Sequence, residues 1–327
     1  MKLERELWLE PLLAIIASVI IYQFNMLFFV FTVPLHMLAL RKDLRSFLTA
    51  AGIVLAFILL QETVRNLGFG LSRQDILIVA IGLYGPIFLL FAAVWFHSLQ
   101  AYMDRFYRFI GSWILPALTG FTLIMIYEGD SQTAIYTREL IEEQFSLLLQ
   151  VGQEIGYGDV LNTFNPEFLY TFVLEVIKRG FLPSLVIQMG LCLYLGYQIN
   201  AKIGKTEKVQ VIRFKVPETI LWPFLIAWTL VLMTSFLELG ILGIIGWNIG
   251  LSLAVLYFLQ GISIFIFQMR TKGVGMKNRS VVLWTIILLL LPGINILAMV
   301  GIPLFGISEI WIHYRDVNKE KLHENNS

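Results

Sequence analysis

The stretch VPLHMLALRKDLR, residues 33–45, is largely apolar through Leu40 and then carries three basic residues within five positions, Arg41, Lys42 and Arg45. In an amphipathic helix of a soluble protein, polar residues recur along one face every three or four positions. Here the polarity changes along the chain instead, as it does where a helix leaves the hydrocarbon core of a membrane. The stretch therefore predicts a membrane-embedded segment that ends at a charged surface.

The composition of the whole chain agrees with this interpretation. Of the 327 residues, 57% are hydrophobic and only 14% are charged, whereas a soluble domain is about one quarter charged. We therefore expect an integral membrane protein whose main partner is the lipid bilayer. The net charge of +1 lacks the basic excess of a nucleic-acid-binding protein. The single cysteine, Cys192, excludes an intramolecular disulfide and a cysteine-based zinc cluster.

Nine apolar segments approach the length of about 20 residues that a helix needs to cross a bilayer. They are 9–24, 26–40, 47–64, 75–96, 108–127, 181–199, 219–238, 248–269 and 281–305. Pro34 interrupts the hydrogen bonding of the second, so one bent segment over 9–40 is an alternative. Pro292 and Gly293 could divide the last segment into a hairpin. The sequence thus predicts an all-α, polytopic transmembrane helical bundle with eight to ten crossings.

Basic residues gather at every second boundary between these segments. The basic boundaries contain Arg41, Lys42 and Arg45, then Arg105 and Arg108, then five cations over 202–215 and four over 270–279. The boundaries between them contain few. Because cytoplasmic loops retain Lys and Arg, this alternation predicts a cytoplasmic amino terminus.

The expected organisation has four parts. Residues 1–127 and 181–312 form transmembrane helices, 128–180 form an external amphipathic loop region, and 313–327 form a polar tail. The loop region contains nine acidic and three basic residues, a net charge of −6. An anionic cytoplasmic leaflet would repel such a surface, which favours the external side.

Two amphipathic helices are expected within that region, over 133–155 and 165–180. Each has apolar residues on one face and polar residues on the other, a pattern typical of helices that lie in the membrane interface. Asn165 and Pro166 predict the start of the second helix, and Gly180 predicts its end. Together these helices would form a cap over the bundle.

Three amide residues, Gln188, Gln260 and Asn295, each lie near the middle of a predicted span. A polar side chain at that depth must find a partner. If the three helices pack together, the amides could converge on a small polar solute. Alternatively, the amides hydrogen-bond between helices as structural contacts, which is the commoner role of such residues.

Two histidines, His36 and His313, are candidate metal ligands. His36 has no second His, Cys or acid at helical spacing, which favours an interfacial histidine over a metal ligand. Glu309 and His313 share one helical face and could pair or bind a metal, but Trp311 and Tyr314 favour an aromatic belt at the interface. The sequence therefore predicts no metal site and no cofactor.

No catalytic constellation is present, so an enzyme is not expected. The stretch GKT, residues 204–206, matches the end of a phosphate-binding loop, but Ile199 stands where that loop requires a glycine. Any energy derived from ATP would therefore come from a partner protein.

Four stretches carry a family resemblance: VPLHMLALRKD (33–43), KVPETILWPFLIAWTLVL (215–232), LYFLQGISIFIFQMR (256–270) and GISEIWIHYR (306–315). Together they resemble the YybS-like family of uncharacterised bacterial membrane proteins. The amino-terminal half of that family is similar to the substrate-binding membrane subunits of energy-coupling-factor transporters. That likeness implies binding of a vitamin or metal, and docking on a coupling subunit through small residues of the first helix, where Ala14 and Ser18 stand.

These observations lead to two functional hypotheses. The first is a solute-binding, transport-related subunit of the bacterial cytoplasmic (inner) membrane that acts with an ATPase partner. The second is a non-transporting membrane scaffold or regulatory protein whose basic loop at 200–218 docks cytosolic partners.

Overall fold

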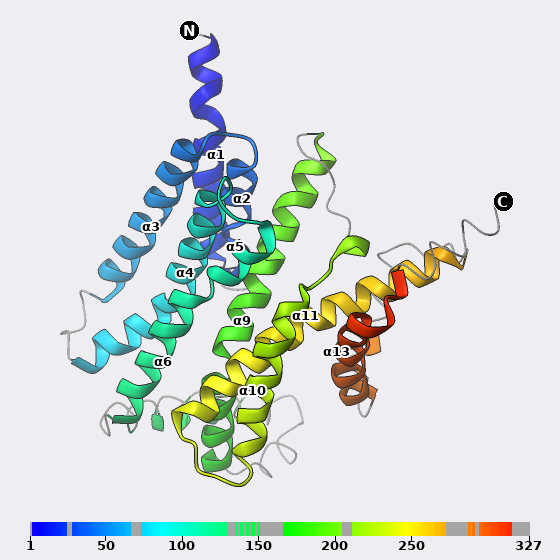
Figure 1. Cartoon of the computed structure of the whole chain (residues 1–327). Coiled ribbons are helices and arrows are strands. Elements are labelled where there is room, and N and C mark those ends of the chain that lie inside the picture. Colours follow the sequence, from blue (N-terminus) through cyan, green and yellow to red (C-terminus); the bar gives the residue numbers. More distant parts are fainter. Residues whose placement is uncertain are drawn as a thin grey trace, which may run out of the picture. The chain divides into compact units, whose positions relative to one another are not determined.

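The computed structural model of the chain (Figure 1) describes residues 2–24, 28–66, 73–129, 166–204, 211–272 and 294–315, with isolated positions between 135 and 150 and between 287 and 291. Within these ranges every regular element is a helix, which confirms the expected all-α class. The chain divides into two compact units, unit 1 at Met1–Lys208 and unit 2 at Val209–Ser327.

Unit 1 is built mainly from long helices. They are α1 (Lys2–Gln23), the 3₁₀ turn η1 (Phe28–Val30), α2 (Val33–Ala39), α3 (Leu44–Asn66), α4 (Arg73–Ser98), α5 (Arg105–Gly111), α6 (Ile114–Gly129) and α9 (Pro166–Lys202). Its core surrounds α2, which contacts α1, α3, α4 and α9. Phe31 and Leu35, from this central segment, are fully buried.

Unit 2 contains η2 (Val211–Arg213), η3 (Glu218–Ile220), α10 (Leu221–Met233), α11 (Ile241–Thr271) and α13 (Ile294–Ile312). The long helix α11 contacts both α10 and α13. A methyl group added to Gly306 of α13 would lie 2.1 Å from the carbonyl oxygen of Tyr257, and one added to Gly261 of α11 would lie 2.2 Å from that of Ile302. The two glycines thus allow α11 and α13 to cross with their backbones in contact, and the paired positions show that the helices run antiparallel.

Several helices have the length and apolarity needed to cross a membrane. In the described part of the chain these are Leu44–Val64, Arg105–Ile126, Tyr170–Lys202, Ile241–Thr271 and Ile294–Ile312, with shorter apolar helices at Leu9–Gln23, Gly82–Ser98 and Glu218–Met233. Large apolar side chains on these helices, such as Leu60 and Leu118, are more than 60% exposed. Lipid accommodates such a surface, and water does not.

The predicted span at 26–40 is not a continuous helix. Its described part is the turn η1, a bend at Phe31 and Thr32, and the seven-residue helix α2, which is only about 10 Å long. Pro34 lies in the first turn of α2, where its missing N–H costs no helical hydrogen bond. The proline therefore starts a new short helix instead of bending a long one.

Two polar contacts establish the direction of the first elements. Nζ of Lys42 lies 3.7 Å from Oε2 of Glu10, and the side-chain amides of Gln23 and Gln61 hydrogen-bond to each other at 2.7 and 3.2 Å. After α2 the chain thus returns to the level of Glu10, in the first half of α1, and α1 and α3 run parallel. A single bent segment over 9–40 is therefore wrong.

The predicted helix end at Gly180 is also wrong. Helix α9 runs without interruption for 37 residues, from Pro166 to Lys202, so the expected boundary between the loop region and the next span falls inside it. A glycine ends a helix by adopting a left-handed backbone, and the described glycines that have a positive φ are Gly204 and Gly240. Gly180 continues the helix, and Phe181 packs against Phe121.

The first predicted amphipathic helix, 133–155, lies largely outside the described residues. Its described positions are helical, and Arg138 contacts Glu142 at 2.9 Å and Glu167 at 3.7 Å. In the last predicted segment, 281–305, the described positions 287, 288 and 290 are helical. Helix α13 begins at Ile294, directly after Pro292 and Gly293, and continues to Ile312.

Candidate functional site

A pair of buried histidines lies inside unit 1, where α2 and α4 end. Nδ1 of His36, on α2, is 2.9 Å from Nε2 of His97, on the last turn of α4. His36 is 1% exposed and His97 is 5% exposed. At this distance one ring donates an N–H to the other, so the two imidazoles share one hydrogen bond inside the bundle.

Aromatic rings and a glycine enclose this histidine pair. The rings of Phe47 and Phe96 lie edge-on to His97, with centroids at 5.3 and 5.2 Å. On α9, a methyl group added to Gly196 would lie 2.9 Å from Cβ of His36. The absence of a side chain at Gly196 therefore lets α2 approach α9 closely enough to place His36 against His97.

A second set of polar contacts joins α9 to the end of α2. Nε of Arg41 donates to Oδ1 of Asn200 at 2.5 Å, and Nδ2 of Asn200 donates to the carbonyl of Met37 at 3.1 Å. Asn200 is fully buried. One turn earlier, the ring of Tyr197 lies 4.9 Å below the guanidinium of Arg105. These contacts place Arg41, Lys42, Arg105 and Arg108 at one end of unit 1, which we call the cation-rich end.

The three amides predicted to bind solute have different environments. On α11, Gln260 is fully buried; its Oε1 accepts from the N–H of Val216 at 2.5 Å and its Nε2 donates to the carbonyl of Gly306 at 2.8 Å. Asn295 accepts from the N–H of Ile296 at the start of α13. Gln188 is a half-buried residue of α9 in unit 1.

Gln260 and Asn295 do not converge. Gln260 contacts Gly306, which follows Asn295 by eleven residues of the same helix, or about 16 Å along the axis. The two hydrogen bonds of Gln260 instead join α11 to α13 and to the segment before η3. This is the structural role that the sequence offered as the alternative to solute binding. Solute binding by Gln188, Gln260 and Asn295 stays a prediction.

Glu309 pairs with an arginine that the sequence did not connect to it. Oε1 of Glu309, which is 3% exposed, lies 3.1 Å from Nε of Arg315. Arg315 also donates to the carbonyl of Phe214 at 2.8 Å and to Oγ of Ser263 at 3.0 Å. His313 has a positive φ of 49°, and this left-handed residue ends α13 so that the chain folds back toward α11.

Sequence reasoning missed the histidine pair because the partners come from distant segments. His36 was judged by its neighbours at helical spacing, whereas His97 follows it by 61 residues. A histidine inside an apolar run was the available signal, since an ionisable residue at that depth is a functional candidate by default. Among the described residues, no cluster of three or more His, Cys, Asp or Glu could hold a metal ion.

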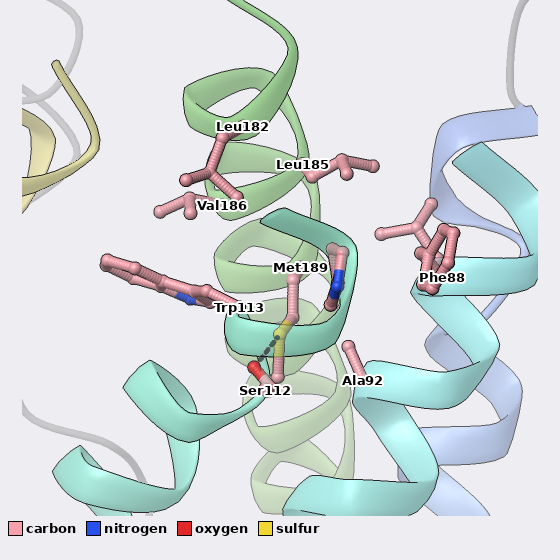
Figure 2. A pocket seen from close by; sticks show the side chains of 10 residues that line it. Phe88, Ala92, Ser112, Trp113, Leu182, Leu185, Val186 and Met189 are labelled. Carbon is pink, nitrogen blue, oxygen red and sulfur yellow. Dashed lines mark hydrogen bonds between the residues drawn. The ribbon is translucent and has the colours of Figure 1, made fainter. Parts of the chain in front are cut away.

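A small apolar cavity in unit 1 lies between α4, the start of α6 and α9 (Figure 2). Trp113, Leu182 and Val186 line it, and Oγ of Ser112 donates to Sδ of Met189 at 3.0 Å. The space open to a water-sized sphere is only about 10 Å³, barely enough for one water molecule. The cavity cannot hold a vitamin-sized solute in this conformation.

The apolar helices, their exposed hydrophobic side chains and the buried ionisable residues define an integral, multi-pass membrane protein. The chain belongs to the family described as predicted membrane protein (DUF2232), whose model matches residues 12–304. It matches none of the curated proteins and none of the solved structures with which it was compared.

Proposed function

We propose that the protein is a solute-binding, transport-related subunit of the bacterial cytoplasmic membrane, and that its working element is the broken segment 28–39. The observation that carries this proposal is the buried contact between His36 and His97. Ionisable residues are costly within a membrane-embedded bundle and mark solute or proton pathways there. The sequence-based resemblance of the family's amino-terminal half to substrate-binding subunits of energy-coupling-factor transporters points to the same function.

The backbone of this segment supports the same function. Transporters build their binding sites from discontinuous helices, because irregular backbone at membrane depth is tolerated only inside protein or along a cavity. The segment η1–α2 is such an interruption, and it packs within the core of unit 1. A movement of α2 away from α9 would open the histidine pair to solute.

The chemistry of the pair suggests the class of solute. A neutral imidazole offers one N–H donor and one ring nitrogen acceptor. Two such rings suit a small polar molecule that both donates and accepts hydrogen bonds. Two histidines are fewer ligands than a zinc site requires, so the proposal is a polar organic solute.

The proposed transport cycle needs a source of energy, and the protein needs a defined orientation in the membrane. Because the sequence contains no complete nucleotide-binding loop, an ATPase partner would drive the transport cycle. We place the cation-rich end in the cytoplasm, together with the amino terminus, since cytoplasmic boundaries retain Lys and Arg and the salt bridge of Glu10 to Lys42 brings the first half of α1 to the same level.

The test is native mass spectrometry of the full chain extracted in detergent, together with uptake measurements in a deletion strain. We expect the purified protein to retain a small molecule, and the His97→Gln variant to lose it while keeping its melting temperature within a few degrees. His313→Gln, at an exposed histidine of unit 2, is the matched control and should keep the molecule.

A protein that never retains a solute, combined with normal uptake of all tested nutrients after deletion, would overturn the proposal. That result would favour the scaffold hypothesis. One observation already fits a scaffold: the amide of Gln260 is fully used in helix packing. Pull-down of soluble partners that is lost on replacing Lys205, Lys208, Arg213 and Lys215 would support it directly.

A further inference from the structure

Three arginines at the cation-rich end of unit 1 have no carboxylate within salt-bridge distance among the described residues. They are Arg41, at the end of α2, and Arg105 and Arg108, on the short helix α5. Their side chains approach the last turns of α9, where Asn200 binds Arg41 and Tyr197 lies under Arg105. Asn200 and Tyr197 are neighbours three residues apart on one helix, so the arginines belong to one patch.

Arg108 is the most unusual member of this patch. Its side chain is only 7% exposed. Its Nη1 donates to the carbonyl of Phe96 at 2.8 Å, and its guanidinium lies 4.7 Å from the centroid of the Phe96 ring. Its Nε is buried without a hydrogen-bond acceptor. A buried guanidinium is stable only when its charge and its donors are matched, and among the described residues Arg108 has a buried, unmatched donor and no paired carboxylate.

Arg41 also has an unmatched donor. Its Nε binds Asn200, whereas its Nη2 is buried without an acceptor. The nearby acids offer little compensation. Glu10 pairs with Lys42, and the carboxylate of Asp43 accepts from Ser46. Asp104 precedes α5 and is electrostatically coupled to Arg108, but it is not within ion-pair distance.

The surroundings of the patch indicate where a counter-ion would come from. Tyr102 is 82% exposed, and Met103 and Tyr107 are each 41% exposed. Exposed aromatic and apolar residues beside arginines at the end of a helical bundle are typical of the headgroup layer of a membrane. Basic pockets between helix ends at this level bind anionic lipid headgroups.

We propose that Arg41, Arg105 and Arg108 form a binding site for a phosphate group, and that an anionic lipid headgroup supplies this phosphate. The lipid phosphate accepts from the accessible parts of the half-buried Arg41 and the exposed Arg105, and the buried Arg108 adds positive charge behind them. Such a lipid would join α2, α5 and α9 at the end of the bundle where the histidine pair lies, independently of whether the protein transports a solute.

The test compares lipid retention in three forms of the full chain: wild type, Arg41→Gln/Arg105→Gln, and Arg45→Gln. Arg45 lies at the same end but is exposed, so Arg45→Gln removes one charge without touching the patch. The probes are phosphatidylglycerol and phosphatidylcholine, added to the detergent-solubilised protein and counted by native mass spectrometry. Inorganic phosphate is added in a separate arm.

We expect wild type and Arg45→Gln to bind phosphatidylglycerol in preference to phosphatidylcholine. The double variant should bind it at least fivefold more weakly, because each basic residue beside an anionic headgroup contributes about that factor. If inorganic phosphate binds saturably and this binding is lost in the double variant, the phosphate site exists, but its natural ligand is the free anion instead of a lipid headgroup.

Equal binding of the two lipids, or equal affinity of the double variant and Arg45→Gln, would overturn the proposal. Since the double variant keeps Arg108 and its contact with Phe96, we expect it to fold. The melting temperature of the double variant, measured with phosphatidylcholine, shows whether it is folded without relying on phosphatidylglycerol binding.

Discussion

His36 and His97 hydrogen-bond to each other through Nδ1 and Nε2 at 2.9 Å, although 61 residues separate them. The short helix α2 and the last turn of α4 supply the two rings, and Gly196 of α9 leaves the room for His36. The contact therefore depends on three segments that pack around the core of unit 1.

The histidine pair should show energetic coupling. Replacing His97 with leucine leaves Nδ1 of the buried His36 without a partner, which we expect to cost about 1–3 kcal/mol of stability. The double variant His36→Leu/His97→Leu should lose less than the sum of the single losses, since both polar groups are then removed. Urea unfolding in detergent measures this cycle, and additive losses would show that the two rings do not interact.

The crossing of α11 and α13 should depend on Gly306. Alanine at this position would place a methyl group 2.1 Å from the carbonyl oxygen of Tyr257. The helices must separate, and we expect a loss of about 1–3 kcal/mol or more. Gly301→Ala is the control on the same helix, because a methyl group there meets nothing within 4 Å. Thermal unfolding in detergent should show a lower melting temperature for Gly306→Ala alone.

Gln260 should stabilise unit 2 through its two hydrogen bonds. Gln260→Leu leaves the buried N–H of Val216 unpaired, at a cost of about 1–3 kcal/mol, and removes a second hydrogen bond to the carbonyl of Gly306. The amide of Gln188 is half-buried, so Gln188→Leu should have a smaller effect. Hydrogen exchange at Val216 should increase in Gln260→Leu. Equal stability of the two variants would contradict the structural role of Gln260.

Asp43 should make the stability of α3 depend on pH. Its carboxylate accepts from the hydroxyl of Ser46 at 2.7 Å and from the Ser46 N–H at 3.3 Å, and these bonds lower the pKa of Asp43 below its ordinary value. A lowered pKa means that the stabilisation is complete above the pKa of the unfolded chain and is lost as the pH falls through the folded pKa.

The expected result is a melting-temperature difference between wild type and Asp43→Asn that is present at pH 7 and shrinks below about pH 4. Asp104→Asn is the matched control, because the side chain of Asp104 makes no capping hydrogen bond at the start of α5. A difference that stays constant from pH 7 to pH 3 would exclude the capping role of ionised Asp43.

Much of the fold follows from local features of the sequence. Long apolar runs such as 47–64 and 248–269 lie within the observed helices α3 and α11, because a chain in lipid must satisfy its own backbone hydrogen bonds. The cations at 41–45 and 105–108 predicted two boundaries on one side, and the structure places Arg41 and Arg105 at one end of unit 1. The continuity of α9 through Gly180 was missed, because a glycine that follows two cations is typical of a helix end, whereas Gly180 keeps a helical backbone.

The candidate sites were less predictable, because polar partners in a helical bundle come from different helices. Gln260 was correctly identified as an amide in need of a partner, but its partners are backbone groups of Val216 and Gly306, which leave no mark in the side-chain pattern. Glu309 was compared with His313 at helical spacing, yet it pairs with Arg315 after the chain reverses.

The sequence by itself determined that the chain resides in a membrane, that its elements are helices, and where most of the spans lie, since these properties depend on the local balance of apolar and charged residues. Only the tertiary structure decided that 28–39 is a broken segment, that α9 is continuous, and which polar groups meet. Those outcomes depend on close approach at Gly196, Gly261 and Gly306 and on contacts between residues far apart in the chain, which no local pattern encodes.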